Sequence, residues 1–284
     1  MFTRILRRDL RKNRVITGII AVFIAMAAML AVSGAKTLAE LMASMNGFFE
    51  KVELPDYMQM HAGETVDLTA VASFSESLDY VKDYQIAEML TVDSSKLYLN
   101  GQSQAATVMD ISLVKQNTGF DFLLDMDNER AAISKGGIGV PVYYKNSVAL
   151  GDTVLVLGKS FVVESFIRDG QMNPSIIHSK RFLISDEDYA EMQDGFEKEY
   201  MLEFRLHDLS RLNDFEAAYG ARALPANGPT ITAGPFKLLN ALTDGIIIAM
   251  LLFLSCFIKL VAVLCLSFCL HSSLEEEQRP IAPM

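Results

Sequence analysis

The sequence contains little cysteine. Its three cysteines, Cys256, Cys265 and Cys269, all lie in one apolar stretch near the C-terminus. The rest of the chain therefore cannot form a disulfide, and it is long enough to fold around an apolar core without one. No histidine lies at a metal-site spacing from these cysteines, and buried cysteine is common, so we interpret all three as packing residues.

Motifs of catalysis and nucleotide binding are also lacking. The histidines are isolated, and the sequence has no HExxH motif and no Cys/His metal pair. It has neither a GxSxG elbow nor a Walker motif. The glycine-rich residues 136–139 lack the Lys-Ser/Thr end of a phosphate-binding loop, and we interpret them as a turn. We therefore predict that the chain is not an enzyme and holds no metal or cofactor.

One acidic cluster resembles part of a calcium-binding loop. Asp125, Asp127 and Glu129 follow one another at alternate positions, and Asp121 precedes them. The glycine and the distant closing glutamate of such a loop are missing. We therefore interpret the cluster as a solvated acidic loop.

Charge is distributed unevenly along the chain, whose formal net charge is −10. Residues 1–14 carry arginines and lysine against one acid, Asp9, whereas acidic side chains outnumber basic ones in residues 35–244. A net-acidic middle argues against a nucleic-acid partner, which requires a basic surface. It is typical of an exposed domain that avoids anionic lipid.

Residues 15–35 contain no charged side chain and predict a first transmembrane helix. As a helix they extend about 30 Å, the thickness of the hydrocarbon core. The preceding basic residues place the N-terminus in the cytoplasm. A cleaved signal peptide is the alternative, because Ser33-Gly34-Ala35 resembles a cleavage site, but the apolar stretch exceeds a usual signal core. Residues 1–14 predict an amphipathic helix on the inner membrane surface, the alternative being a basic flank that only sets topology.

Residues 245–270 predict a second transmembrane helix that contains one charge, Lys259. Charge near the middle of a span is costly, so Lys259 is predicted to face a protein partner or polar cavity, or else to reach a shifted membrane boundary. Small residues suited to close helix packing recur on one side of the first span: Gly18, Ala21, Ala25 and Ala28. Alanine is also simply common in such helices.

The middle of the chain shows a mixed pattern of helices and strands. Strands are predicted at residues 57–61, 85–92, 96–99, 138–144, 153–157, 160–167 and 200–206. Helices are predicted at residues 67–83 with Asp67 as N-cap, 186–192 capped by Ser185, and 209–219. Residues 225–235 are rich in proline and glycine and predict a linker. The pattern indicates an α+β domain of two subdomains, flanked by two transmembrane helices.

Four phrases in a fixed order carry a family resemblance: residues 138–144 (IGVPVYY), 150–153 (LGDT), 168–175 (RDGQMNPS) and 179–182 (SKRF). Together with the order of basic helix, span, outer domain and span, they make the whole chain similar to FtsX-like/MacB-type ABC transporter permeases of Gram-positive bacteria. The resemblance implies a MacB-like periplasmic core in the middle domain. The phrases themselves are interpreted as fold determinants, since Gly151-Asp152 suits a tight turn and Asn173-Pro174 an extended residue before proline.

The same resemblance implies partners. A cytoplasmic ABC ATPase would bind ATP and Mg²⁺, and further permease helices or a second permease chain would complete the assembly in the lipid bilayer. The family's ATPase-contacting helix follows the second span, and the matching positions here are Glu275, Glu276, Glu277, Arg279 and Ile281. The match then fails at Pro280 and Pro283, which break a helix. Family members normally continue to further spans, so the chain is expected to correspond to their N-terminal part.

The predicted organisation is therefore a multi-pass bacterial membrane protein with both termini in the cytoplasm. Its segments are a basic helix (1–14), a span (15–35), an extracytoplasmic α+β domain (36–241), a second span (242–270) and a cytoplasmic tail (271–284). The predicted function is a permease subunit, or part of one, that couples ATP hydrolysis by a partner to movement of the outer domain for export or mechanotransmission. The alternative is a two-span sensor or accessory protein with an extracytoplasmic ligand-binding domain.

Overall fold

The computed structural model describes residues 14–63 and 66–278. The chain divides into two compact units, one made of the helical segments that flank Met45–Thr243 and the other made of Met45–Thr243 itself. The predicted amphipathic helix lies, apart from Arg14, outside the described residues, as do Arg279 and Ile281.

Two long helices form the first unit and continue into the second: α2 (Arg14–Val52) and α6 (Ala233–Gln278). Within the first unit they approach closely at Gly34, where a Cβ atom would lie 2.9 Å from Cδ2 of Leu252. Among the described residues, one helical stretch, Ile24–Val52, is long and apolar enough to cross a membrane, and a shorter apolar stretch is Leu252–Val261. The second predicted span remains a prediction.

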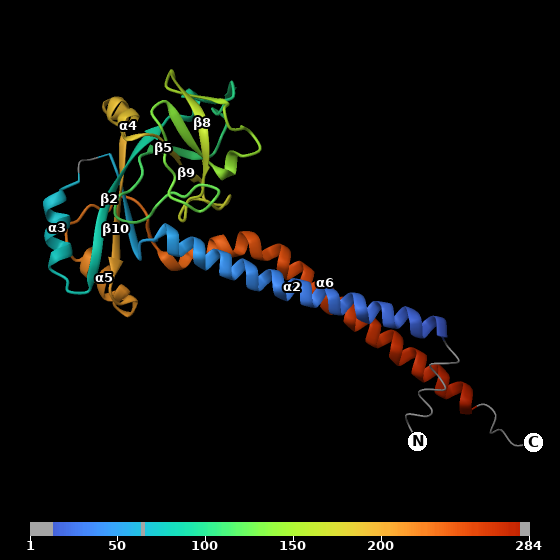
Figure 1. Ribbon diagram of the computed structural model, residues 1–284. Helices are drawn as coiled ribbons and strands as arrows, with labels where there is room; N and C mark the ends of the chain where they lie inside the picture. The colour runs from blue at the N-terminus through green and yellow to red at the C-terminus, as the bar shows by residue number, and fades with distance from the viewer. Residues whose placement is uncertain (1–13, 64–65, 279–284) are drawn as a thin grey trace, which may run out of the picture. The chain divides into compact units, whose positions relative to one another are not determined.

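The second unit is built on one mixed sheet (Figure 1). Its strands are β1 (Tyr57–Ala62), β2 (Val81–Val92), β3 (Leu97–Leu99), β4 (Gln102–Ser103), β5 (Asp110–Val114), β6 (Gly137–Pro141), β7 (Thr153–Val156), β8 (Lys159–Ile167), β9 (Ser179–Leu183), β10 (Lys198–Leu206) and β11 (Thr230–Thr232). Their order is β11-β1-β10-β2-β5-β9-β6-β8-β7-β3-β4. Most neighbours are antiparallel, whereas β5 pairs with β9 and β6 with β8 in parallel.

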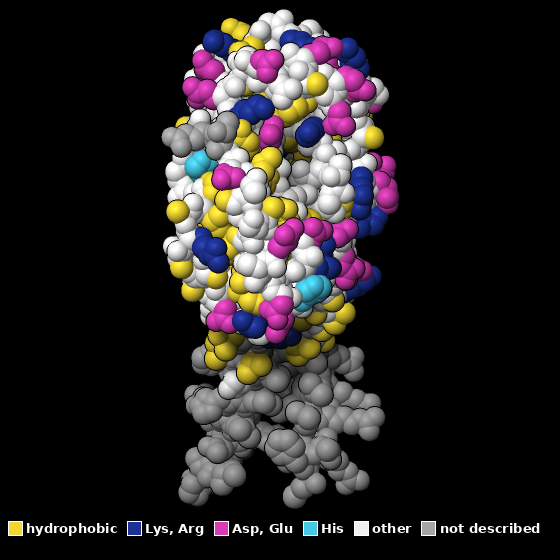
Figure 2. Space-filling view, turned by 90° about the vertical axis from the view of Figure 1, so that its left-hand side faces the viewer, with side chains coloured by type: hydrophobic (Ala, Val, Ile, Leu, Met, Phe, Trp, Pro, Cys, Tyr) yellow, Lys and Arg dark blue, Asp and Glu magenta, His cyan; other side chains and the backbone are white. Residues whose placement is uncertain are grey.

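Short helices complete the unit: α3 (Leu68–Glu76), α4 (Asp186–Met192) and α5 (Leu212–Gly220), with 3-10 turns at Ser94–Lys96, Val142–Tyr144, Gln193–Gly195 and Leu209–Arg211. Figure 1 shows α3 and α5 lying against β2 and β10. Figure 2 views this side and shows acidic and basic side chains interspersed over it. The α+β class predicted from the sequence is therefore confirmed.

Successive residues of β10 point to opposite faces of the sheet and supply two different apolar clusters. Leu202 and Phe204 face α3 and α5, in a cluster that includes Phe74 and Phe215. Met201 faces the other way, into a cluster that contains the end of α2 and the start of α6. The central strands are thus covered on both sides.

A third apolar cluster fills the far end of the sheet, around Phe161 of β8 and Phe182 of β9. The sheet therefore has separate apolar cores within Met45–Thr243, which is one of the two compact units of the chain.

Most predicted elements of the middle domain are present, and the exceptions have local causes. The helix expected over residues 67–83 is capped by Asp67 as predicted but ends at Glu76. Val81, which fits the helical apolar face, instead begins β2 and pairs with Leu206. Strand pairing across the sheet outweighs the helical periodicity at this point.

Other strands and one helix start differ from expectation. The strands β5 and β9 were not predicted. β9 begins with Ser179 and contains two buried charged residues, Lys180 and Arg181, so its sequence lacks the apolar pattern that is typical of a buried strand. The predicted linker contains β11 and the start of α6, whose first turn accommodates Pro235. Residues 142–144, predicted as strand, form a 3-10 turn.

The glycine-rich turn is only partly as predicted. Gly136 has a φ of 81° and makes the turn, whereas β6 begins at Gly137. Gly139 lies inside that strand, where a Cβ atom would be 2.8 Å from Cγ2 of Ile167. Close packing against β8, and not turn geometry, explains this glycine.

The aromatic core predicts a strong effect of one truncation. Phe204 is fully buried and its ring contacts Phe74 and Phe215. Phe204→Ala should lower the free energy of unfolding by about 3–5 kcal/mol through lost transfer energy and a cavity. Thermal unfolding of the detergent-solubilised full chain measures this, with Leu209→Ala, at a 62% exposed position, as the control. Equal melting temperatures for the two variants would contradict this packing.

Candidate functional site

The end of α2 and the start of α6 are built into the core of the sheet unit. Phe48 and Val52 of α2 and Phe236 of α6 belong to the same buried cluster as Met201 of β10. The Asn240 side chain donates a hydrogen bond to the carbonyl oxygen of Gly170 at 3.3 Å. Both helix ends are therefore fixed to the sheet by packing, and α6 also by a polar contact. We call this region the helix junction.

A glycine permits the closest packing in the helix junction. A Cβ atom on Gly170 would lie 2.6 Å from Cγ1 of Val52 and 2.8 Å from Cδ2 of Leu54. Val52 is fully buried and β-branched, so it has little freedom to move aside. Gly170 thus lets the loop after β8 approach the end of α2.

Two residues with left-handed backbone conformation join the end of α2 to a distant loop. Glu53 has a φ of 56° and Asp121 a φ of 51°. The amide of Asp121 donates to the carbonyl oxygen of Glu53 at 3.0 Å, and the amide of Phe122 donates to that of Val52 at 2.8 Å. Such backbone conformations cost about 1–3 kcal/mol each and persist only where the surroundings fix them.

Ion pairs fix both of these residues. The Glu53 carboxylate lies 2.5 Å from Nη1 of Arg205 and 3.6 Å from Nη2 of Arg130. The Asp121 carboxylate lies 2.7 Å from Nη1 of Arg181. Each strained residue is therefore held through its side chain to a different strand, β10 or β9.

Arg181 is the centre of a buried charge cluster. Its Nε and Nη2 atoms each lie 2.6 Å from an oxygen of Asp169, which gives a bidentate pair in addition to the Asp121 contact. The three side chains are at most 5% exposed. Burial opposes ionisation of Asp169, but the Arg181 guanidinium and two backbone donors outweigh it and hold the pKa of this carboxyl below its usual value.

Asp169 also shapes the following loop. Its Oδ1 atom accepts hydrogen bonds from the amides of Gln171 at 2.8 Å and Met172 at 3.0 Å. One carboxylate thus joins β9 to the turn that carries Gly170, and through Gly170 to the helix junction.

Glu203 of β10 lies beside this cluster and is fully buried. Its two oxygens accept hydrogen bonds from the side-chain amides of Gln171 and Gln85, each at 2.7 Å. Burial raises the pKa of Glu203 well above its usual 4.5, and the Asp121 carboxylate raises it further, against the opposing effect of Arg181. Burial and the Asp121 carboxylate therefore both favour the neutral form of Glu203.

Lys180 fixes the loop between Met172 and Ser179. Its ammonium donates to the carbonyl oxygens of Met172 at 2.7 Å, Pro174 at 3.1 Å and Ile177 at 2.5 Å. Burial lowers the pKa of Lys180 to about 8, against the opposing effect of Asp169. Lys180 and Arg181, which are neighbours on β9, therefore both hold the loop between β8 and β9. Arg181 binds Asp169 near the start of this loop, and Lys180 binds the carbonyl oxygens that follow.

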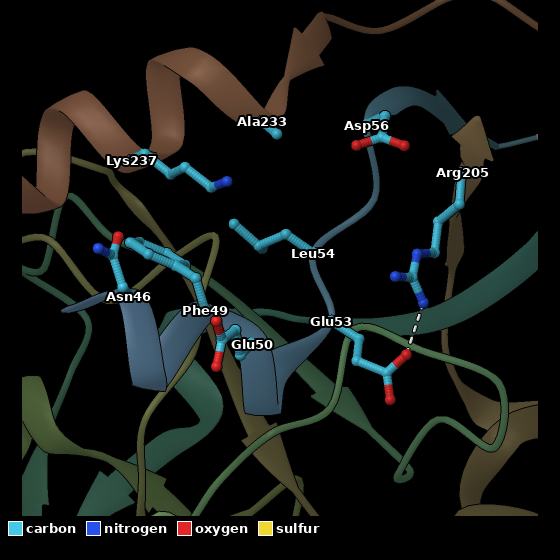
Figure 3. Close-up of a pocket in the computed structure, with 9 residues that line it drawn as sticks. All are labelled: Asn46, Phe49, Glu50, Glu53, Leu54, Asp56, Arg205, Ala233 and Lys237. Carbon is cyan, nitrogen blue, oxygen red and sulfur yellow. Dashed lines mark hydrogen bonds and ion pairs between the residues drawn. The ribbon is translucent and has the colours of Figure 1, made fainter. Parts of the chain in front are cut away.

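An open pocket of about 460 Å³ lies at the helix junction. Figure 3 shows its lining residues: Asn46, Phe49, Glu50, Glu53, Leu54, Asp56, Arg205, Ala233 and Lys237. They come from the end of α2, the turn after it, β10 and the start of α6. The pocket therefore touches both helix ends and the β10 arginine that pairs with Glu53.

The sequence alone missed these site residues. The phrases at residues 168–175 and 179–182 were interpreted as fold determinants, and the structure shows that Asp169, Lys180 and Arg181 there form a buried polar network. The available signal was an adjacent lysine and arginine directly before the apolar residues Phe182, Leu183 and Ile184. Asp121 was assigned to a solvated loop and is instead buried against Arg181, so that assignment was wrong.

In the rest of the acidic cluster, Asp127 and Glu129 are exposed and Asp125 is half-buried. One oxygen of Asp125 accepts hydrogen bonds from the amides of Asp127 and Glu129, each at 2.9 Å. Within the described part of the chain, no group of three or more His, Cys, Asp or Glu residues could hold a metal ion.

The residues predicted to pack in the membrane lie on the surface of the chain. Small residues of α2 that were assigned to helix packing are exposed, namely Gly18, Ala21, Ala25 and Ala28. Lys259 and Cys256 of α6 are exposed as well, so Cys256 is not packed within this chain. Glu275, Glu276 and Glu277 lie in the last turn of α6. The predicted helix and ATPase contacts remain predictions.

No protein-family model matches the sequence. No curated protein matches it either.

The chain is similar to several solved structures. The periplasmic region of MacB from Actinobacillus actinomycetemcomitans is 11% identical, with a TM-score of 0.36 over 67% of this chain and 94% of that one. A putative lipoprotein from Bacillus anthracis is 12% identical, with a TM-score of 0.36 over 62% and 97%. The extracellular domain of the noncanonic ABC-type transporter YknZ from Gram-positive bacteria is 12% identical, with a TM-score of 0.32 over 56% and 87%. A likeness this distant carries no functional argument.

Gly170 provides a test of the helix junction. Gly170→Ala should lower the free energy of unfolding by about 1–3 kcal/mol, because its methyl group would overlap Val52 and Leu54. Gly195→Ala is the matched control, since a Cβ atom there meets nothing within 4 Å. Thermal unfolding of the full chain measures both. Equal stability of the two variants would show that the approach is not tight.

Glu203 provides a pH test. A carboxyl with a raised pKa keeps its proton in the folded state but loses it in the unfolded state above about pH 4.5, so folding stability falls as pH rises above that value. Glu203→Gln removes this pH-dependent contribution to the free energy of unfolding and keeps an uncharged side chain at the position. The melting temperature of the variant relative to wild type should therefore increase from pH 5 to pH 8. A difference that stays constant would show that Glu203 is ionised in the folded protein.

Proposed function

We propose that this chain is a permease subunit of an ABC transporter, or part of one, in which movement of membrane helices is conveyed to an extracytoplasmic domain. The observation that carries the proposal is the helix junction. The end of α2 and the start of α6 pack in the core of the sheet unit, together with Met201. Displacing either helix end would therefore strain or move the sheet.

The surfaces of α2 and α6 support their placement in a bilayer. Large apolar side chains are exposed on α2 at Val22, Ile24, Met26, Met29 and Val32. They are exposed on α6 at Ile246, Met250, Phe253, Leu254, Phe257, Leu260, Val263 and Leu264. Contiguous exposed apolar surface of this kind marks contact with lipid or other helices. With the basic N-terminal segment inside, both termini are cytoplasmic and the sheet unit is extracytoplasmic.

The proposed partners follow from two features of the sequence. It contains no Walker motif for ATP binding, and it resembles FtsX-like/MacB-type permeases. ATP and Mg²⁺ are bound by a separate cytoplasmic ABC ATPase, which contacts Glu275, Glu276, Glu277, Arg279 and Ile281. Further permease helices, or a second permease chain, cover the small-residue side of α2 and the exposed Lys259 of α6.

The junction is suited to conveying force because it is stiff. The left-handed residues Glu53 and Asp121 are hydrogen-bonded to each other, and each is held by an arginine of the sheet. Interiors packed in this way respond to displacement by shifting as a whole and not by deforming locally. Closure of an ATPase dimer on the cytoplasmic side would thus alter the position of the outer domain.

The alternative, a two-span sensor or accessory protein, draws on one observation. The pocket at the helix junction is large enough for a small ligand and touches both helix ends. Such a protein would convey a ligand signal through α6, with no ATPase bound to the chain.

Affinity purification of the natively expressed chain in mild detergent distinguishes the two. The proposal predicts that a cytoplasmic ABC ATPase is recovered at near-equal amounts. Joint alanine substitution of Glu275, Glu276 and Glu277 should lower that recovery several-fold, through loss of charged contacts. The control replaces Asp214 and Glu216, which are exposed on α5, and should leave recovery unchanged. Recovery of the intact chain without any ATPase would contradict the transporter proposal.

A further inference from the structure

We infer that the pocket at the helix junction binds a small zwitterion, meaning a molecule that carries both a primary ammonium and a carboxylate or phosphate. The pocket holds about 460 Å³, within the usual range for small-molecule sites. It is too small for a folded partner.

Three of the charged side chains that line the pocket already have partners within the chain. Glu53 and Arg205 form an ion pair at 2.5 Å. Oδ2 of Asp56 accepts a hydrogen bond from the amide of Leu206 at 2.8 Å. These groups define one wall and are not free to rearrange without breaking contacts to β10.

Lys237 and Glu50 differ from the other charged residues in the pocket. Both are exposed, and within the described residues neither forms an ion pair or a side-chain hydrogen bond. Figure 3 shows the Lys237 side chain extending from α6 toward Leu54, with Glu50 on the other side of Phe49. An unpaired ammonium and an unpaired carboxylate therefore border the same hollow from different helices.

The balance of charges favours a ligand with both signs. Three carboxylates and two basic groups line the pocket, namely Glu50, Glu53, Asp56, Arg205 and Lys237. A simple anion would be repelled by the carboxylates, and a simple cation by Lys237 and Arg205. A zwitterion can place its anionic group on Lys237 and its ammonium on Glu50.

Two apolar side chains complete the site. Phe49 and Leu54 line the pocket between the charged groups, and the Lys237 ammonium lies 5.8 Å from the centroid of the Phe49 ring. An apolar segment between the two charged ends of a ligand would pack on these side chains. A short dipeptide and the glycerophosphoethanolamine head group of a lipid share this chemistry.

An occupant would bridge α2 and α6. Glu50 belongs to α2 and Lys237 to α6, so binding would stabilise the present arrangement of the helix ends by mass action. This regulatory consequence rests on the proposed function, whereas binding itself does not.

Calorimetry of the full chain in detergent tests the inference with two zwitterionic probes, L-alanyl-L-alanine and glycerophosphoethanolamine. At least one should bind saturably, with one molecule per chain. Blocked forms of the dipeptide, N-acetylated or C-amidated, should bind at least about tenfold more weakly, because each lacks one charge. Preference for the dipeptide would identify a soluble amino compound as the source of the ligand, and preference for glycerophosphoethanolamine would identify a lipid head group.

Charge-swap variants separate a specific site from general electrostatic attraction. Glu50→Lys and Lys237→Glu should each abolish binding, and the double variant should restore it with the ligand reversed. The control exchanges the exposed charges of Lys145 and Glu187 and should bind as wild type does.

Binding of neither probe, equal binding of the blocked dipeptides, or unchanged binding by the single variants would overturn the inference. The assay contains no ATPase, so its outcome is independent of the purification experiment that tests the transporter proposal.

Discussion

The contact of Arg181 with Asp169 and Asp121 is the interaction on which the helix junction depends. Asp121 is joined through its backbone to Glu53 at the end of α2. Asp169 shapes the turn that carries Gly170, which packs on Val52 and accepts a hydrogen bond from Asn240 of α6. One guanidinium on β9 therefore holds the two loops that contact the two helices. Removing one partner from a buried pair of this kind costs about 3–5 kcal/mol, since a charge is left buried alone.

A buried cluster of charges stabilises a core only after the free energy of removing each charge from water has been offset. Apolar residues of similar volume often give equal or greater stability. Charged groups instead contribute a defined geometry, because a bidentate arginine–carboxylate pair fixes both the distance and the plane of its partners. We propose that this is why the junction contains them, because left-handed residues such as Glu53 and Asp121 need a specified geometry. The raised pKa of Glu203 fits the same account, because a charged carboxylate there would be repelled by Asp121.

The sequence predicted those parts of the fold that depend on local pattern. The helix capped by Ser185 has the predicted bounds, and the alternating strand over residues 160–167 is present as β8. The prediction failed where a distant partner decides the conformation. Val81 continues a helical pattern but pairs with β10, and Lys180 and Arg181 interrupt an apolar pattern in a buried strand whose loops satisfy their charges. The pocket could not be predicted either, because Glu50, Arg205 and Lys237 are far apart in the sequence.

Hydrogen exchange of the full chain in lipid nanodiscs tests the central claim, that Arg181 holds the end of α2 to the sheet unit. In Arg181→Met, the amides of Asp121 and Phe122, which donate to Glu53 and Val52, should lose protection. Amides of β7, at Thr153–Val156, should keep theirs, because this strand pairs at the far end of the sheet. Unchanged protection at Asp121 and Phe122 in a folded variant would contradict the claim, as would equal loss of protection in β7.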